Sequence, residues 1–399
     1  MREICPVVIG LGYVGLPIFL NLQKNFKTIG YDINKKRIAS LKNKLDFNKE
    51  YKPNSLKLSK NSVFTNLIDD IKKGNFYIIA VPTPVKKNNL PDLTLLKKSC
   101  KTLSKIIKKN DIIFFESTVY PTVTDKVCIP ILKKSGLTEN KDFYVGYSPE
   151  RINPGDKQKT LKSIPKIVAF KNNKIKNNVT KVYKKISKKI IYSKNIIEAE
   201  TSKVVENIQR DLNIGLINEI YKVCDIANIN FKNVMSLAKT KWNFVPYEPG
   251  LVGGHCLPVD PYYFSYFAKS IGIETNILLS GRKTNNKMVD FVTSKIFKKL
   301  KNISNLSEKR ILVLGLTYKK NVADIRNSLA IKVLKKLKKK YENIKTYDPY
   351  LEKKNYKNLK IIKFDDIKKY DVYIILNNHD IFKKLKKFIL KKILITPFF

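Results

Sequence analysis

Residues 10–15 read Gly10-Leu11-Gly12-Tyr13-Val14-Gly15, and they lie between a short apolar run, residues 4–9, and a segment of helical spacing that ends near Gln23. In the pattern G-x-G-x-x-G the first glycine permits a tight turn, the second lets the backbone approach a pyrophosphate, and the third allows close helix packing. A second strand, residues 27–31, ends at Asp32, where a carboxylate can bind a ribose diol and repel a 2′-phosphate. The stretch therefore predicts a βαβ unit that binds NAD rather than NADP.

The alternation of strands and helices continues along the chain. Apolar strands at residues 76–81 and 111–115 are separated by a Lys-rich helical segment, residues 93–108, and this order predicts a doubly wound parallel sheet. The spacing is helical from residue 197 to about 227, and strands return at residues 310–315. We therefore predict an α/β chain of two Rossmann-like doubly wound sheet domains joined by a central helical domain, with boundaries at 1–195, 196–297 and 298–399.

The composition is that of a folded globular chain. Of 399 residues, 43% are hydrophobic and 28% charged, and the formal net charge is +46. The lysines occur in short runs throughout the chain, and no basic stripe is interleaved with stacking aromatic residues, as a single-strand binder would need. We expect no nucleic-acid partner, and a basic nucleic-acid-binding protein is only a distant alternative.

Cysteine and histidine usage argues against disulfides and metal centres. The five cysteines contain no C-x-x-C pair and there are only two histidines, so we predict no disulfide framework and no metal site. Arg2 and Glu3 lead directly into a strand-like run, which is not a signal peptide, and no uncharged stretch approaches the length of a membrane helix. We expect a cytoplasmic location and no membrane partner.

Three polar loops follow predicted strands, at residues 81–84, 116–121 and 147–156. Loops at the carboxyl ends of parallel strands are where such sheets bind ligands, although proline and Ser/Thr in any one loop are also ordinary turn chemistry. On the long predicted helix a row of polar residues recurs at spacings of three and four, so its members share one face. This row is either a solvated face or a means of placing an ammonium and an amide beside one oxyanion; it contains Glu200, Lys203, Asn207 and Arg210.

A glycine-rich segment, residues 250–261, contains one of the five cysteines. Cys256 follows Gly253, Gly254 and His255, and Asp260 lies four residues further on. A single cysteine is usually a buried small hydrophobe, but here the glycines let a substrate approach the sulfur and the carboxylate could orient or deprotonate water. The segment favours a nucleophilic role for Cys256.

Together these motifs resemble the UDP-glucose/GDP-mannose dehydrogenase family over about residues 4–380. The resemblance rests on G-L-G-Y-V-G-L-P, V-P-T-P, E-S-T-V-Y-P, Y-S-P-E-R-I-N-P-G-D, G-L-V-G-G-H-C and L-G-L-T-Y-K-K-N-V-A-D-I-R-N-S. It is strongest to the bacterial UDP-N-acetylhexosamine 6-dehydrogenases of surface polysaccharide synthesis. It implies an NAD-dependent, four-electron oxidation of the sugar C6 alcohol to a uronate, through a thiohemiacetal and a thioester on Cys256, by a homodimer or larger homo-oligomer that associates through its central helices.

The resemblance also assigns residues to roles. Catalytic positions, for the nucleophile, the oxyanion and the water, are Cys256, Lys203, Asn207, Asp260, Glu150 and Thr118. Cofactor-binding positions are Gly10, Gly12, Tyr13, Val14, Gly15, Asp32, Arg37, Thr83, Thr118 and Arg326. Substrate-binding positions are Glu150, Arg151, Ile152, Lys203, Asn207, Arg210, Gly253 and Lys319, and the last sheet domain is expected to bind the uridine diphosphate.

The sequence departs from the family pattern in three places. Thr122 stands where glycine commonly follows Y-P, Asn377 and Asn378 precede His379-Asp380 in place of small apolar residues, and the sequence ends at Phe399 where relatives usually continue, so we expect a C-terminally shortened third domain. The substrate is expected to be UDP-GlcNAc or UDP-GalNAc. UDP-ManNAc or UDP-glucose, or a nucleotide-sugar-binding protein that has lost turnover, are the alternatives.

Overall fold

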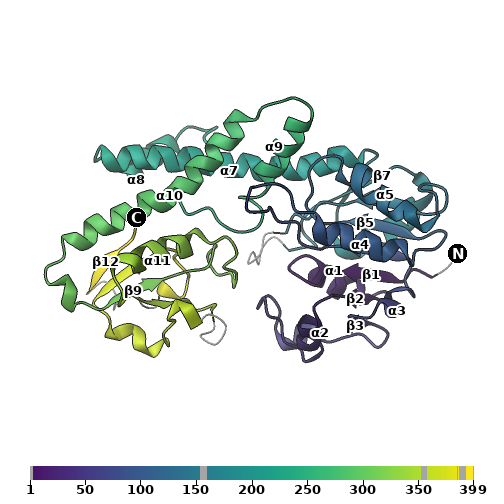
Figure 1. Ribbon diagram of the computed structural model, residues 1–399, viewed down its shortest axis with the longest axis horizontal. Helices are drawn as coiled ribbons and strands as arrows, with labels where there is room; N and C mark the ends of the chain where they lie inside the picture. Colours follow the sequence, from purple (N-terminus) through teal and green to yellow (C-terminus); the bar gives the residue numbers. More distant parts are fainter. Residues whose placement is uncertain (1–2, 153–159, 352–356, 384, 386–391, 399) are drawn as a thin grey trace. The chain divides into compact units, whose positions relative to one another are not determined.

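The computed structural model describes residues 3–152, 160–351, 357–383, 385 and 392–398. The chain forms two compact units. The first comprises Met1–Glu206 and Tyr262–Ile273, and the second comprises Asn207–Pro261 and Glu274–Phe399. Figure 1 shows the first unit's strands in purple to teal and the second unit's in green to yellow.

The first unit is built on an eight-stranded sheet with the order β3-β2-β1-β4-β5-β6-β7-β8. Neighbouring strands are parallel except β6 and β7. The described part of the connection between these two strands contains no crossover helix, which a parallel return would require. The predicted parallel sheet therefore ends at β6, and β7 and β8 extend it in the opposite direction. The strands are β1 (Pro6–Ile9), β2 (Ile29–Tyr31), β3 (Val63–Thr65), β4 (Phe76–Ile79), β5 (Ile112–Phe115), β6 (Tyr144–Tyr147), β7 (Lys166–Phe170) and β8 (Ile190–Ser193).

In the first unit, helix α1 contacts α6 and helix α4 contacts α5. Val8, Ile78 and Phe114 of the central strands share a buried apolar cluster with residues of α1 and α6. Residues of β4 and β5 are buried throughout, as expected for parallel strands covered on both faces. The helices are α1 (Gly15–Leu22), α2 (Lys35–Lys42), α3 (Ile68–Ile71), α4 (Thr94–Ser104), α5 (Ile129–Leu132) and α6 (Lys176–Ile186).

The middle of the chain is helical, as predicted. The long helix predicted over residues 197–227 is α7 (Ile196–Ile226), and it is followed by α8 (Phe231–Ala238), α9 (Asp260–Ser270) and α10 (Asn276–Lys301). The division between the two units falls inside α7 and again inside α9. In the part of the chain that the structure describes, no helix is both long and apolar enough to cross a membrane.

The second unit contains a four-stranded sheet in the order β10-β9-β11-β12. All three strand pairs are parallel. Helix α11 packs on α10, and apolar residues of both helices join one face of the sheet in a single buried cluster. The elements are β9 (Ile311–Leu314), α11 (Leu329–Lys340), β10 (Lys345–Tyr347), β11 (Val372–Ile375) and β12 (Ile393–Ile395).

Candidate active site

The glycine-rich turn joins β1 directly to α1 in the first unit. Gly10 has φ +92°, and a Cβ there would lie 2.8 Å from the Ala80 carbonyl oxygen. A Cβ on Gly15 would lie 1.8 Å from the Gly10 oxygen, whereas one on Gly12 would meet nothing within 4 Å. Protein backbone thus fills the space at Gly10 and Gly15, whereas Gly12 faces open space. The turn leads into the N-terminus of α1, where backbone N–H groups can bind a phosphate. The turn fits the pyrophosphate of NAD.

Asp32 lies at the end of β2, next to this turn. Its Oδ2 accepts the Leu11 N–H at 2.9 Å and its Oδ1 accepts the Asn34 N–H at 2.9 Å. The carboxylate is half-buried, so these two bonds fix its orientation and leave lone pairs for a ribose diol. Its position agrees with the predicted contact to NAD.

Arg37, a predicted cofactor contact, is buried beneath the turn. Its Nε donates to the Leu11 carbonyl oxygen at 2.9 Å, and its Nη1 forms an ion pair with Asp46 at 2.8 Å. These bonds tie α2 to the turn. Arg37 therefore supports the backbone around the predicted contacts Tyr13 and Val14, both of which are half-buried.

Thr83 and Thr118 lie in the loops after β4 and β5, and the structure brings them together. Thr83 Oγ1 donates to the Thr118 carbonyl oxygen at 2.5 Å. Tyr263 donates its hydroxyl to the carbonyl oxygens of Thr83 and Pro84, at 2.8 and 3.1 Å. The two predicted polar loops therefore form one connected edge of the first sheet, as their placement after neighbouring strands suggested.

The loop after β6 carries Glu150, and both of its carboxylate oxygens are bonded. Glu150 Oε1 accepts the backbone N–H groups of Arg151 and Ile152 at 2.7 and 2.5 Å, and Oε2 pairs with Lys166 at 3.1 Å. Arg151 in turn pairs with Glu206 at 2.8 Å. The predicted substrate contacts 150–152 therefore form one ordered turn, while residues 153–156 of the same predicted loop lie outside the described residues.

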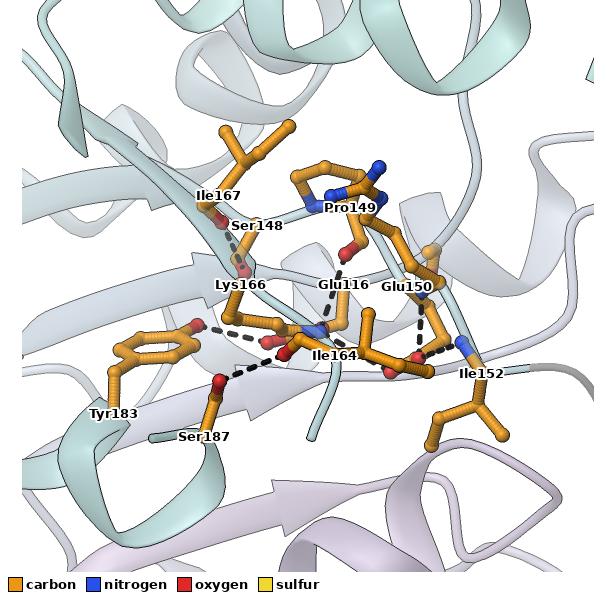
Figure 2. A network of polar contacts seen from close by, with 12 residues as sticks. Glu116, Ser148, Pro149, Glu150, Ile152, Ile164, Lys166, Ile167, Tyr183 and Ser187 are labelled. Atoms are coloured by element: carbon orange, nitrogen blue, oxygen red, sulfur yellow. Dashed lines mark hydrogen bonds and ion pairs between the residues drawn. The ribbon is translucent and has the colours of Figure 1, made fainter. Parts of the chain in front are cut away.

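Lys166 is the first residue of β7, and its ammonium group is buried. It pairs with Glu116 at the end of β5 as well as with Glu150, and Tyr183 donates to the other oxygen of Glu116 at 2.9 Å. Figure 2 shows Lys166 pointing toward both glutamates. Burial raises the pKa of Glu116 to about 7 against the attraction of Lys166. Burial by itself lowers the pKa of Lys166, but the two carboxylates outweigh it and raise that pKa, so the ammonium keeps its proton.

Glu200 and Lys203 of α7 are both buried in the first unit, which argues against the solvated-face interpretation of this part of the row. Glu200 accepts the N–H groups of Thr122 and Thr124 at 2.7 and 2.9 Å. Thr122, which replaces the expected glycine, has φ +82°, a region that a β-branched residue seldom adopts. Burial raises the pKa of Glu200 to about 7, against the hydrogen bonds from Thr124 and Thr122.

In the second unit, Asn207 and Asp260 come together although 53 positions separate them. Asn207 Nδ2 donates to Asp260 Oδ2 at 2.5 Å, and Asn207 Oδ1 accepts from Arg210 Nη2 at 2.6 Å. Asn207 and Asp260 are buried and Arg210 is exposed. The amide is thereby fixed between a carboxylate and a guanidinium.

Cys256 is half-buried one helical turn before Asp260. Its carbonyl oxygen accepts the backbone N–H of Asp260 at 2.9 Å. None of the five cysteines forms a disulfide. The turn that holds the sulfur therefore leads straight into the buried carboxylate that Asn207 orients.

The glycines before Cys256 pack closely on the loop after β9. A Cβ on Gly253 would lie 2.6 Å from the Asn327 carbonyl oxygen. Gly254 has φ +93°, and a Cβ there would lie 2.7 Å from the Tyr318 ring. Arg326 pairs with Asp324 and reaches His255 at 3.3 Å. The predicted contacts Gly253 and Arg326 thus lie together, and Lys319 is half-buried in the same loop, where its carbonyl oxygen accepts from Thr317.

A buried polar network anchors the cysteine segment, and sequence reasoning missed it. Asn218 of α7 exchanges hydrogen bonds with both backbone groups of Gly250, and Arg282 of α10 donates to the Val252 oxygen at 3.4 Å. Arg282 also pairs with Asp211 at 2.5 Å, and burial raises the pKa of Asp211 to about 6 although Arg282 opposes it. Lys166 and Glu116 were missed as a pair as well. The only local feature that could have indicated this pair is the position of Lys166, a charged residue between Pro165 and the apolar residues of β7.

The glycine turn on a Rossmann-like sheet, with a half-buried cysteine beside an oriented carboxylate, is typical of an NAD-dependent oxidoreductase. Three domains of one family match the chain: the NAD binding domain of the UDP-glucose/GDP-mannose dehydrogenase family at residues 3–187, its central domain at 197–287 and its UDP binding domain at 312–398. The chain belongs to the UDP-glucose/GDP-mannose dehydrogenase family. The predicted family, fold class and NAD cofactor are confirmed.

Named relatives support the subgroup. A UDP-N-acetyl-D-glucosamine 6-dehydrogenase of Salmonella typhi is 44% identical over 353 residues, 88% of this chain and 83% of the relative. One of Pseudomonas aeruginosa is 42% identical over 354 residues, 88% of this chain and 84% of the relative. A solved UDP-D-ManNAc dehydrogenase of Pyrococcus horikoshii superposes with a TM-score of 0.86 at 29% identity, covering 98% of this chain and 95% of that one.

Proposed function

We propose that this protein oxidises the C6 hydroxymethyl group of a UDP-N-acetylhexosamine, UDP-GlcNAc or UDP-GalNAc, to the uronate, with NAD as the oxidant. The two relatives reported at 44% and 42% identity are named for UDP-N-acetyl-D-glucosamine. The product would enter surface polysaccharide synthesis. We assign residues 1–195 to NAD binding, 196–297 to catalysis and association, and 298–399 to the uridine diphosphate.

The observation that carries this proposal is the geometry around Cys256. A half-buried thiol precedes by one turn a buried carboxylate, Asp260, which Asn207 holds at 2.5 Å. An amide that donates to one group and accepts from another has a fixed orientation, and preorganised donors of this kind stabilise developing negative charge. A cysteine that served only packing would not require such neighbours.

The chemistry assigned to the chain's residues has three stages. NAD, when bound, accepts one hydride in each of the two oxidation steps. Cys256 attacks the C6 aldehyde to form a thiohemiacetal, and the second oxidation converts this to a thioester. Lys203 and Asn207 stabilise the oxygen that becomes negative, and Lys203 assists proton transfer. Water then bonds to the thioester carbon, the C–S bond breaks, and the uronate leaves with the Cys256 thiolate restored.

The remaining assignments follow the family positions. Thr118, Glu150 and Asp260 position or activate the water. NAD is bound by the glycine turn with Asp32, Thr83 and Arg326, while Arg37 supports that turn from beneath. The UDP-sugar is bound by Arg151, Ile152, Arg210, Gly253 and Lys319. The hydrogen bonds at Asp32 and in the turn 150–152 support these assignments because they hold the groups in one orientation.

A direct assay tests the proposal. The purified protein is incubated with NAD and each of UDP-GlcNAc, UDP-GalNAc, UDP-ManNAc and UDP-glucose, and the absorbance of NADH is followed. We expect two NADH per sugar consumed, with an N-acetylhexosamine preferred. NAD binding without reduction by any of the four sugars would instead identify a binding protein that has lost turnover.

The covalent role of Cys256 has its own test. Cys256→Ser is expected to abolish release of the uronate while the UDP-sugar still binds, because a hydroxyl is a far weaker nucleophile than a thiolate and a poorer leaving group. The uronate is measured by chromatography and sugar binding by calorimetry. Wild-type uronate production by this variant would rule out the covalent mechanism.

UDP-ManNAc is the second candidate substrate. The solved structure at 29% identity is a UDP-D-ManNAc dehydrogenase. GlcNAc and ManNAc differ only at C2, so the same turns and the same cysteine would serve either sugar. The relative kcat/KM for the two sugars in the assay above decides between them.

We further propose that the protein is a cytoplasmic homodimer or larger homo-oligomer. The helices of the second unit expose large apolar side chains, including Val223, Ile226, Leu237 and Ile277 at 60%, 75%, 72% and 72% of their surface. Such residues on one set of helices favour association. Light scattering after size exclusion measures the assembly, and a reducing compartment keeps Cys256 as the thiol.

A further inference from the structure

We propose that Lys166 is a positioning residue that holds the Glu150 turn in the conformation needed for hydrolysis of the thioester, an inference that rests on the proposed function. No role was assigned to Lys166 or to its partner Glu116 from the sequence. Their contacts, their burial and the number of charges they bring together support this role (Figure 2).

Lys166 connects the ends of three strands through one buried ammonium group. It pairs with Glu116 after β5, with Glu150 after β6, and donates to the Pro149 carbonyl oxygen at 3.2 Å. The side chains of Lys166 and Glu116 are 3% and 0% exposed. These contacts fix both the backbone at the start of the turn and the carboxylate that the turn carries.

The other half of Glu150 is fixed by the turn itself. Its Oε1 accepts the Arg151 and Ile152 N–H groups, and Arg151 Nη1 donates to the oxygen of Pro165, the residue before Lys166, at 3.2 Å. The turn and the first residues of β7 are therefore joined at two points. If the ammonium were lost, the Oε2 oxygen would lose its cation and the turn one of its anchors.

The charge balance argues against a purely stabilising role. Two carboxylates and one ammonium are buried together, and a buried ion pair is often no better for stability than apolar residues of the same size. Burial raises the pKa of Glu116 to about 7, and burial with the neighbouring Glu116 raises the pKa of Tyr183 well above its ordinary value. Burying this cluster of charges is costly, and the cluster fixes the orientation of the Glu150 carboxylate. Such clusters of groups with shifted pKa values are typical of functional sites.

Loss of Lys166 should affect the last step of the reaction, the hydrolysis of the thioester. A water oxygen bonds to the thioester carbon, its proton passes to a carboxylate, the C–S bond breaks, and sulfur leaves as the thiolate. Displacing a group that orients the water by about 1 Å can slow such a step by about 10²-fold. The two oxidation steps use no water molecule, and Arg151 keeps its bonds to Glu206 and the Pro165 oxygen when Lys166 is removed. The thioester is therefore expected to accumulate.

The test compares Glu116→Gln with the double variant Glu116→Gln/Lys166→Met, because the first change removes the carboxylate that would otherwise lose its counter-ion. Each full-length protein is mixed with NAD and UDP-GlcNAc, and NADH formation and the intact mass are followed over time. Relative to Glu116→Gln, we expect the double variant to form the NADH of one turnover, to retain a covalent adduct on Cys256, and to release uronate about 10²-fold more slowly. NAD affinity should be unchanged.

A matched control and a second variant complete the design. Glu116→Gln/Lys181→Met removes an exposed lysine of α6 and should behave as Glu116→Gln. If Glu116→Gln/Lys166→Met does not fold, Glu116→Gln/Lys166→Gln replaces it, because the amide introduced at position 166 can still donate to Glu150. This variant is expected to form the same covalent adduct and to release uronate faster than expected for Glu116→Gln/Lys166→Met. Release of uronate at the Glu116→Gln rate, or equal loss of NADH formation and release, would overturn the inference. Absence of NADH formation by the wild-type protein with every sugar would instead overturn the proposed function, and this inference with it.

Discussion

In each sheet an aspartate follows the strand that pairs with the first strand of that sheet in chain order: Asp32 follows β2, which pairs with β1, and Asp348 follows β10, which pairs with β9. The two carboxylates have different surroundings. Asp32, after β2, is half-buried and accepts the N–H groups of Leu11 and Asn34. Asp348, after β10, is fully buried and accepts the N–H groups of Leu316 and Thr317 at 2.7 and 3.1 Å. The same topological position therefore leaves a carboxylate partly exposed in one sheet and encloses it in the other.

His379 accounts for part of this difference. Its Nδ1 accepts the Asn321 N–H at 2.9 Å, so its Nε2 carries the proton and faces Asp348 Oδ2 at 3.1 Å. The histidine is 0% exposed. It lies in the Asn377–Asp380 segment that departs from the family pattern, and it completes the hydrogen bonding of Asp348.

The loops after the first strands explain the rest. In the first sheet residues 10–14 lead directly into α1, whereas residues 315–328 separate β9 from α11. The longer loop packs on the cysteine segment, where Asn327 donates to the Gly254 oxygen at 3.0 Å. A short glycine turn exposes helix N–H groups to a phosphate, and a long loop covers the strand end. The two sheets thus differ in loop length: the short turn of the first sheet fits a phosphate, and the long loop of the second sheet supports the cysteine segment.

The largest effect that we expect is from Asp348→Ala. It leaves two buried N–H groups and the neutral His379 ring without their acceptor, and each buried donor that is left unsatisfied costs about 1–3 kcal/mol. The midpoint of urea unfolding of the full-length protein should fall, with NAD affinity unchanged. Asp348→Asn keeps one acceptor oxygen, so its unfolding midpoint should fall less than that of Asp348→Ala. An unchanged midpoint for Asp348→Ala would refute the structural role of this carboxylate.

The first unit has a fully buried carboxylate of its own, Glu200, and it predicts a pH dependence. Burial raises its pKa from 4.5 to about 7, so the folded protein binds this proton more tightly than the unfolded chain does. The free energy of unfolding should therefore fall as the pH rises from about 4.5 to about 7, by about 3 kcal/mol at most from this group. Unfolding by urea at several pH values measures the slope.

Glu200→Gln should flatten that slope, and Glu198→Gln, an exposed position on the same helix, should leave it as in the wild type. Glu116 titrates in the same range in all three proteins, so only the difference between the slopes is informative. Equal slopes for wild type and Glu200→Gln would contradict the prediction.

Gly15→Ala tests the short turn. Its Cβ would lie 1.8 Å from the Gly10 oxygen, so the turn must shift, and we expect NAD affinity to fall by about 10²-fold, equivalent to roughly 2.7 kcal/mol. Gly12→Ala adds a methyl group into open space and should fold as stably as the wild type while still weakening NAD binding. Fluorescence titration gives both affinities. Wild-type affinity in Gly15→Ala would show that the turn is not the NAD site.

The smallest expected effect is that of Asp32→Ala. The loss of hydrogen bonds to the ribose should weaken NAD binding by about tenfold, or roughly 1.4 kcal/mol, and reduce the preference for NAD over NADP. Because the carboxylate is half-buried, stability should change much less than in Asp348→Ala. If the two alanine variants destabilise the protein equally, the contrast between the two strand ends is wrong.

Much of the fold was predictable because its signals are local. The glycine turn, the acid after the second strand and the helix over residues 197–227 each follow from periodicity and backbone sterics within a short window. The antiparallel β7 was not predicted, because the direction of a strand depends on how the chain returns rather than on its own residues. Helix spacing singled out Lys203 and Asn207, and the glycine-rich segment singled out Cys256 and Asp260. Their roles came from motif resemblance and stay proposals.

The sequence by itself determined that the chain has two Rossmann-like sheets around a helical middle, that it binds NAD, and that Cys256 stands in a segment unsuited to packing. Only the tertiary structure decided that Asn207 meets Asp260, that Asp348 is enclosed by His379, and that Lys166 joins two glutamates. Hydrophobic periodicity is written into neighbouring residues, whereas a buried polar contact between distant residues depends on which strand ends the fold brings together.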